Sequence, residues 1–197
     1  MDQRLVLASS NPGKLREFNA LLAPRGYRIC PQGDFSVTDV EETGTTFVEN
    51  ALLKARHACR LSGLPALADD SGLAVDALAG APGIHSARYA GEPKDDTANN
   101  RKLLAALAEV PEGQRTARYW CVLVWLQHEF DPVPRIVQAS WSGEILAHPR
   151  GEGGFGYDPL FWVPERGVSA AELSAEDKNQ LSHRGRALRE LMELLDR

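Results

Sequence analysis

Two adjacent carboxylates, a hydroxyl and a glycine stand together at Asp69-Asp70-Ser71-Gly72, directly after the apolar residues 65–68. Carboxylate oxygens suit Mg²⁺, which usually takes one or two protein carboxylates together with phosphate oxygens. Neighbouring side chains of a strand point to opposite faces, so both aspartates can face one ligand only where a strand ends. We therefore expect a strand that ends at Asp69-Asp70, where the carboxylates form either a metal site or an ordinary polar turn.

A second set of residues could hold phosphate. Small residues and a lysine, Ser9-Ser10-Asn11-Pro12-Gly13-Lys14, lie between an expected strand at 4–9 and an expected helix at 14–22. Backbone N–H groups at a helix N-terminus attract phosphate, and Lys14 adds a full positive charge. The Walker A spacing GxxxxGK[ST] is absent. The alternative is an ordinary capped helix start with a solvated lysine.

The clearest helix signal is the capping box Thr46-Phe47-Val48-Glu49, with Gly63 as the expected stop. Lys54 lies on this helix, where it could reach a phosphate or be solvated.

Two later stretches could bind a flat ring. Glycines surround Phe155 and Tyr157 in residues 150–159, so the backbone can approach a ligand and Phe155 can stack on it. Lys178 and Ser182-His183-Arg184-Gly185 supply cationic donors at the N-terminus of an expected last helix, which is marked by Leu188, Leu191, Met192 and Leu195. The alternatives are aromatic side chains that fill the core and a solvated helix start.

Composition narrows the class of protein. The chain has 197 residues, 43% of them hydrophobic, and a net charge of −5, which suits a globular protein and disfavours nonspecific nucleic-acid binding. We expect neither a signal peptide nor a membrane span. The three cysteines show no CxxC pattern and indicate a reducing compartment, with the cytoplasm as the default.

The order of the elements indicates a mixed-sheet α/β fold. Besides the elements above, we expect a strand at 27–31, a helix at 96–110, a long hairpin formed by residues 116–127 and 133–140, and a strand at 160–163. Residues 73–78 fit either a strand or a short helix, and residues 170–181 a helix or turns.

Six segments together resemble the inosine triphosphate pyrophosphatase family, also called Ham1-like, in its bacterial dITP/XTP branch. The resemblance runs from residue 5 to about 190, and serine at position 9 departs from the threonine expected in many relatives. The segments that carry it are residues 9–14, 41–55, 68–73, 80–88, 153–159 and 182–185.

The resemblance implies two α/β lobes around a long mixed sheet flanked by helices, with the active site in the cleft, in a single catalytic domain over residues 1–197. It implies a Mg²⁺-dependent enzyme that hydrolyses ITP, dITP and XTP to the monophosphate and pyrophosphate, and typically a homodimer. It assigns Asp70 as proton acceptor, Glu41 and Asp70 as metal ligands, and Asp69 as their support. Substrate would be held by Ser9, Ser10, Asn11, Pro12, Gly13, Lys14, Lys54, Ser71, Phe155, Gly156, Tyr157, Asp158, Lys178, His183 and Arg184.

Cleavage to pyrophosphate requires attack of water on the α-phosphorus, and Asp70 could take the proton. The sequence leaves open whether Asp69 shares that task. Cationic donors at Lys178, His183 and Arg184 would favour the C6 carbonyl of hypoxanthine and xanthine over the amino group of adenine. How guanine is rejected stays open. Two other hypotheses remain: a Maf-like pyrophosphatase of modified nucleotides, and a nucleotide-binding module without turnover.

Overall fold

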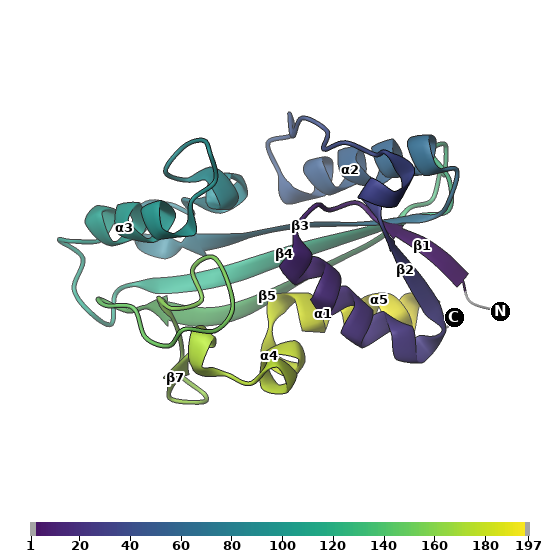
Figure 1. Ribbon diagram of the computed structural model, residues 1–197. Helices are drawn as coiled ribbons and strands as arrows, with labels where there is room; N and C mark the ends of the chain where they lie inside the picture. Colours follow the sequence, from purple (N-terminus) through teal and green to yellow (C-terminus); the bar gives the residue numbers. More distant parts are fainter. Residues whose placement is uncertain (1–2, 196–197) are drawn as a thin grey trace. The chain divides into compact units, whose positions relative to one another are not determined.

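The computed structural model describes residues 3–195, and in this part of the chain seven strands form one sheet in the order β2-β1-β3-β4-β5-β6-β7. β1 pairs in parallel with β2 and β3, whereas β6 pairs antiparallel with β5 and β7, so the predicted mixed α/β sheet is confirmed (Figure 1). The strands are β1 (Gln3–Leu7), β2 (Tyr27–Pro31), β3 (Ala66–Val75), β4 (Thr116–Leu126), β5 (Arg135–Ile145), β6 (Phe161–Val163) and β7 (Val168–Ser169).

The α-helices are α1 (Pro12–Leu22), α2 (Phe47–Ser62), α3 (Asp96–Ala106), α4 (Ala175–Leu181) and α5 (His183–Leu195). Short 3-10 helices occur at η1 (Ala23–Arg25), η2 (Gln32–Phe35), η3 (Asp76–Leu78), η4 (Gly83–Arg88) and η5 (Ala170–Glu172). One predicted helix boundary was wrong: α3 ends four residues before the expected 110, because the chain turns at residues 107–109. α5 begins at His183, within the segment 182–185 that was expected at the N-terminus of the last helix.

The chain divides into two compact units. Unit 1 comprises the chain up to Asp70, Cys121–Ala139 and the chain from Ala187, and unit 2 comprises Ser71–Trp120 and Ser140–Arg186. β3, β4, β5 and α5 each contribute residues to both units. The single catalytic domain stays a prediction.

Unit 1 buries both faces of its parallel strands. Leu5 and Leu7 of β1 join the core cluster of α1 and α5, whereas Val6 and Ala8 join the cluster of α2. Alternate residues of a strand point to opposite faces, and parallel strands are normally covered on both sides. Figure 1 shows the result, with α2 on one face of these strands and α1 and α5 on the other.

β3 corrects the expected strand end. The strand continues through Asp69 and Asp70 to Val75, so the two carboxylates lie inside a ten-residue strand. The physical reason is that each carboxylate meets a lysine, from a different helix, and can therefore be buried without ending the strand. Residues 73–78, for which strand and helix were both open, are the end of β3 followed by η3.

Unit 2 has an aromatic core. Trp141 and Phe161 are almost fully buried, and Tyr119 packs on both, with ring centroids 6.4 Å and 4.7 Å away. β5 extends to Ile145, five residues beyond the predicted end, so that Trp141 lies within the strand. Within residues 3–195, no helix is both long and apolar enough to cross a membrane.

Candidate functional site

Asp69 faces α1, where its carboxylate forms an ion pair with Lys14. Lys14 Nζ donates hydrogen bonds to Asp69 Oδ1 at 2.5 Å and to the Asp69 carbonyl oxygen at 3.3 Å. The Cys121 thiol donates to Asp69 Oδ2 at 3.4 Å. The Asp69 side chain is 0% exposed. The solvated lysine considered from the sequence is therefore wrong, since Lys14 is the counter-ion of a buried carboxylate.

Asp70 faces α2, on the other side of the strand. Lys54 Nζ donates to Asp70 Oδ1 at 2.6 Å and to Glu42 Oε1 at 2.9 Å. Burial raises the pKa of Asp70, and the positive charges of Lys54 and Lys14 oppose that rise. Burial alone would lower the pKa of Lys54, but Asp70 and Glu42 outweigh it and leave that pKa above its ordinary value. Lys54 is therefore a fixed positive charge between two carboxylates.

The two adjacent glutamates differ in their surroundings. Glu42 is half-buried and bonded to Lys54, whereas Glu41 is exposed and, among the described residues, forms no ion pair. Sequence reasoning named Glu41 and gave Glu42 no role. The segment that carries both, residues 37–46, has no helix or strand. Its far end is fixed by Asn50, whose side-chain oxygen accepts from Gly44 N at 2.8 Å.

The donor set is compatible with Mg²⁺. In residues 3–195 no group of three or more His, Cys, Asp or Glu side chains could hold a metal ion. Mg²⁺ does not need such a group, because one or two carboxylates suffice when substrate phosphates supply other ligands. Asp70 can supply one such carboxylate. Lys54 donates a hydrogen bond to its Oδ1, and no hydrogen bond to its Oδ2 occurs among the described residues. Glu41 could supply the second carboxylate.

The expected phosphate loop is tied together by its own side chains. Asn11 caps α1, and its Oδ1 accepts from Gly13 N at 2.8 Å and Lys14 N at 3.2 Å. Ser9 Oγ accepts from Asn11 N at 3.2 Å, and Pro12 occupies the exposed first turn. The helix N–H groups expected to meet phosphate therefore have a partner within the loop, and a phosphate would replace Asn11.

Asp39 is a neighbour of this loop that sequence reasoning missed. Ser10 Oγ donates to Asp39 Oδ2 at 3.0 Å, and the buried Gln32 donates to Asp39 Oδ1 at 2.6 Å. The carboxylate therefore links the loop to the segment that carries Glu41 and Glu42. A single aspartate in a polar connection gives no signal of this in the sequence.

In unit 2, a glycine-rich loop and two cations surround Phe155. Lys178 Nζ lies 4.8 Å from the ring centroid of Phe155 and the Arg184 guanidinium lies 5.8 Å from it. Lys178 Nζ also donates to the buried Asp158 at 2.5 Å, and Phe155 N donates to the same carboxylate at 2.8 Å. Gly154 has a φ of 75° and a Cβ there would collide with Asp158, so only glycine fits.

His183 lies in the first turn of α5 and stacks on Tyr119, with ring centroids 4.8 Å apart and planes 8° apart. Tyr119 is buried, and this burial raises its pKa well above the ordinary value. Tyr119 is a second residue that sequence reasoning missed, because its stacking partner His183 is distant in sequence and no local pattern indicates the contact. Tyr157 instead packs in the core and donates to Ser86 O at 2.8 Å.

The structure thus gathers the predicted residues in two groups. Unit 1 brings together Lys14, Lys54, Asp69 and Asp70, with the loop of Ser9 to Gly13 at the start of α1. Unit 2 brings together Phe155, Asp158, Lys178 and Arg184, and Gly156 N donates to Asp96 Oδ2 at 2.8 Å in the same loop. Ser71 is half-buried in β3, next to Asp70.

Comparisons with known proteins are consistent with this arrangement. A family model described as the Ham1 family matches residues 5–194. A Shigella flexneri protein named dITP/XTP pyrophosphatase is 56% identical over 193 residues, which cover 98% of each chain. One of the same name from Xylella fastidiosa strain Temecula1 is 58% identical over 98% of this chain and 97% of its own. The solved structure of a HAM1 protein from Coxiella burnetii has a TM-score of 0.91 and 49% identity, and the match covers 98% of both chains.

Proposed function

Because the chain belongs to the Ham1 family, we propose that it is a hydrolase of non-standard purine nucleotides, which cleaves ITP, dITP and XTP to the nucleoside monophosphate and pyrophosphate. One observation carries the proposal: Lys54 Nζ lies 2.6 Å from Asp70 and 2.9 Å from Glu42. A carboxylate of raised pKa beside a fixed cation is suited to taking a proton near a polyphosphate.

Asp70 is the proton acceptor in this proposal. Attack of water on the α-phosphorus requires a base, and the pKa of Asp70, raised by burial, lies nearer to neutral pH than that of an exposed aspartate. Asp69 is unsuited to the task, because its side chain is 0% exposed and ion-paired with Lys14. Its role is to hold Lys14 at the start of α1.

Asp70 and Glu41 would hold Mg²⁺, which supplies positive charge to the phosphate oxygens when it is bound. Lys54 would offset charge on the departing pyrophosphate. Glu42 would affect Asp70 through Lys54, because the carboxylates of Glu42 and Asp70 both pair with the Lys54 ammonium group.

The triphosphate would lie against the loop before α1, with Ser71 nearby on β3. There Ser9, Ser10 and Asn11 offer side-chain groups, and Gly13 and Lys14 offer N–H groups now bonded to Asn11. Pro12 has no N–H and fixes the backbone of the first turn.

The base would be recognised by the residues of unit 2. Phe155 offers a half-buried ring, and Lys178, His183 and Arg184 offer donors to a C6 carbonyl. An adenine amino group would be mispaired with these donors, and a site built for a hydrogen bond rejects such a partner strongly. Gly156, Tyr157 and Asp158 shape the loop, since Asp158 binds both Lys178 and Phe155 N.

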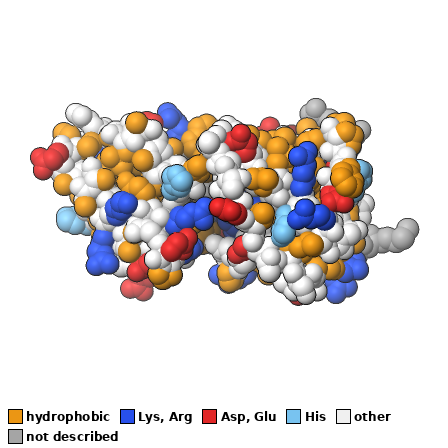
Figure 2. All heavy atoms as spheres, turned by 90° about the horizontal axis from the view of Figure 1, so that it is seen from above, with side chains coloured by type: hydrophobic (Ala, Val, Ile, Leu, Met, Phe, Trp, Pro, Cys, Tyr) orange, Lys and Arg blue, Asp and Glu red, His pale blue; other side chains and the backbone are white. Residues whose placement is uncertain are grey.

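We further propose that the enzyme works in the cytoplasm as a homodimer. The three cysteines are free and buried, as is usual for a protein in a reducing compartment. On the face drawn in Figure 2, basic and acidic groups are intermixed with hydrophobic ones, a pattern that does not favour binding of a nucleic-acid backbone to that face.

Replacement of Asp70 by Asn tests the proposal. We expect release of pyrophosphate from dITP to fall by about three orders of magnitude or more, because the attacking water loses its proton acceptor. Binding of dITP, measured by calorimetry, and the melting temperature should stay close to the wild type. Near-normal turnover of the variant would refute the assignment.

A further inference from the structure

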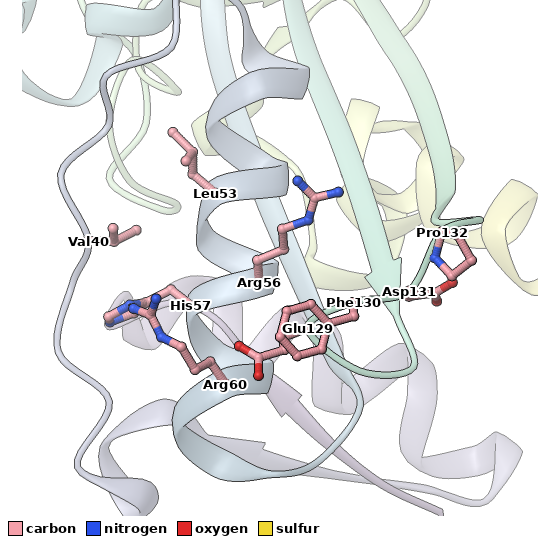
Figure 3. Close-up of a pocket in the computed structure, with 9 residues that line it drawn as sticks. All are labelled: Val40, Leu53, Arg56, His57, Arg60, Glu129, Phe130, Asp131 and Pro132. Carbon is pink, nitrogen blue, oxygen red and sulfur yellow. The ribbon is translucent and has the colours of Figure 1, made fainter.

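Two phenylalanine rings of the chain are presented in opposite ways. Phe130 is 79% exposed and projects from the loop between β4 and β5, beside a cavity of about 610 Å³ in unit 1 (Figure 3). Phe155 is half-buried in the glycine-rich loop of unit 2, and hydrogen bonds hold the backbone on both sides of it. A ring held in place binds a flat ligand more tightly, because ordering a mobile loop on binding costs free energy.

The first anchor of Phe155 lies on its N-terminal side. Its backbone N–H donates to Asp158 Oδ2 at 2.8 Å, which fixes the peptide group between Gly154 and Phe155. The Asp158 carboxylate is held in turn by its ion pair with Lys178. This anchor restrains only one of the two backbone torsion angles of Phe155, the angle φ.

α3 supplies the second anchor. Gly156 N donates to Asp96 Oδ2 at 2.8 Å, and Asn100 Nδ2 donates to Gly156 O at 3.0 Å. The first bond fixes the peptide group between Phe155 and Gly156, and with it the angle ψ of Phe155, while the second fixes the next peptide group. Gly156 has a φ of 64°, and it needs such restraint because no side chain limits the backbone of a glycine.

Asp96 and Asn100 suit this contact by their spacing. They are four residues apart on α3 and therefore lie on the same face of the helix. The helix is capped by Asp95, whose Oδ1 accepts from Thr97 N at 2.8 Å and Ala98 N at 3.0 Å. Asp96 Oδ2 is therefore left for the loop, and its bond to a backbone N–H is charge-assisted.

α3 is a rigid support for the loop. The buried Asn99 accepts from Ala90 N at 2.6 Å and donates to Ala87 O at 3.0 Å, so the helix is tied to η4 and the residues after it. The loop is tied to the same segment, since Tyr157 OH donates to Ser86 O at 2.8 Å. α3, η4 and the loop thus form a closed ring of contacts within unit 2.

We propose that Asp96 and Asn100 are positioning residues for base recognition: they bind both hydrogen-bonding groups of Gly156 and so fix the Phe155 ring in the orientation that stacks on a purine. They act through the loop and not on the nucleotide itself. The proposal rests on the base site of the proposed function and adds the two residues that hold it in place.

Steady-state kinetics with dITP tests the role of Asp96. Asp96→Ala should raise KM about tenfold and leave kcat within about twofold, because stacking stabilises bound substrate and transition state alike. Asp96→Asn keeps an acceptor for Gly156 N and should stay within about threefold of the wild-type KM. Thr97→Ala, exposed on the same helix turn, is the matched control and should leave both constants unchanged. A wild-type KM in Asp96→Ala overturns the proposal.

Asn100 is tested by a change that keeps its shape. Asn100→Asp places a carboxylate oxygen against Gly156 O, so repulsion should raise KM about tenfold or more. Asn100→Ala only removes the donor and should raise KM less, by about threefold. If Asn100→Asp binds dITP as the wild type does, the assignment of Asn100 is wrong.

A double-mutant cycle shows whether Asp96 acts through Phe155. Asp96→Ala added to Phe155→Ala should raise KM no further, because the ring that Asp96 positions is already gone. Additive losses would give Asp96 a structural role elsewhere and would overturn the proposal.

Phe155→Ala alone separates this inference from the function on which it rests. A wild-type KM in that variant would refute the base site and, with it, the positioning residues. A raised KM in Phe155→Ala together with a wild-type KM in Asp96→Ala would refute the positioning alone.

Amide hydrogen exchange measures the second anchor without turnover. The Gly156 amide should exchange about tenfold faster in Asp96→Ala than in the wild type, since its acceptor is removed. Thr97→Ala should leave that rate unchanged. An unaltered rate in Asp96→Ala would show that the carboxylate does not restrain the loop, and it would overturn the proposal.

Discussion

At the scale of single residues, the two aspartates of β3 differ in their surroundings because each forms an ion pair with a different lysine. Asp69 is enclosed with Lys14, whereas Asp70 is 10% exposed and shares Lys54 with Glu42. The strand geometry separates them, since neighbouring side chains lie on opposite faces. The buried pair of Asp69 and Lys14 holds the start of α1 in place, whereas the partly exposed Asp70 is available to a substrate.

Lys14→Met should destabilise the protein by about 3 kcal/mol, because it leaves the buried Asp69 carboxylate without a counter-ion. Urea denaturation at neutral pH measures this loss. Lys14→Met combined with Asp69→Asn should cost less than the sum of the two single changes. A neutral Lys14→Met variant would show that Asp69 does not depend on this lysine.

The adjacent glutamates should respond differently to loss of charge. Glu41→Gln should raise the Mg²⁺ concentration for half-maximal activity by about tenfold or more, as loss of a ligand. Glu42→Gln should slow turnover while that Mg²⁺ requirement stays nearly constant, because it frees one side of Lys54. The reverse pattern would assign the metal to Glu42.

At the scale of elements, α2 was predictable and the course of β3 was not. The capping box of Thr46 and Glu49 and the stop at Gly63 are local signals, and the structure confirms both. The continuation of β3 depends on Lys14, which is 55 residues from Asp69, and on Lys54, 16 residues from Asp70. A local pattern of two aspartates cannot contain those partners, so the expected strand end was wrong.

The capping box gives α2 a dependence on pH. Hydrogen bonds from Thr46 and Thr45 hold the pKa of Glu49 below its ordinary value of 4.5. A lowered pKa stabilises the fold above that ordinary value, and the contribution is lost as the pH falls through the folded-state pKa. Glu49→Gln should therefore lower the melting temperature at pH 7 and matter progressively less below pH 4.5.

Glu193→Gln, an exposed change on α5, is the control for this effect and should leave the melting temperature nearly unchanged. If the deficit of Glu49→Gln is the same at acid and neutral pH, the lowered pKa of Glu49 does not contribute to the stability of the helix.

At the scale of the whole molecule, the groups suited to phosphate chemistry belong to one unit and the groups suited to a base belong to the other. The resemblance named residues from both units, but the unit boundary inside β3 follows from contacts distant in sequence. Phe155 and Arg184 could be anticipated from a glycine-rich loop and a helix start. Tyr119, which stacks on His183, could not, because its partner lies 64 residues away in sequence.

Arg184→Ala should reduce the preference for ITP over ATP, expressed as the ratio of kcat/KM values, by about tenfold or more. Arg184→Lys keeps a cationic donor and should retain part of that preference. Changes in unit 1 such as Asp70→Asn should instead slow all substrates alike. An unchanged ratio in Arg184→Ala would remove this residue from base recognition.

The most direct measurement is the identity of the first phosphorus product. Purified protein with Mg²⁺ is given dITP, XTP, ITP, ATP and GTP, and the products are resolved by ³¹P NMR. We expect pyrophosphate and the monophosphate from dITP, XTP and ITP, with far slower turnover of ATP and GTP. Orthophosphate and a diphosphate as the first products would mean attack at the γ-phosphorus and would contradict the account.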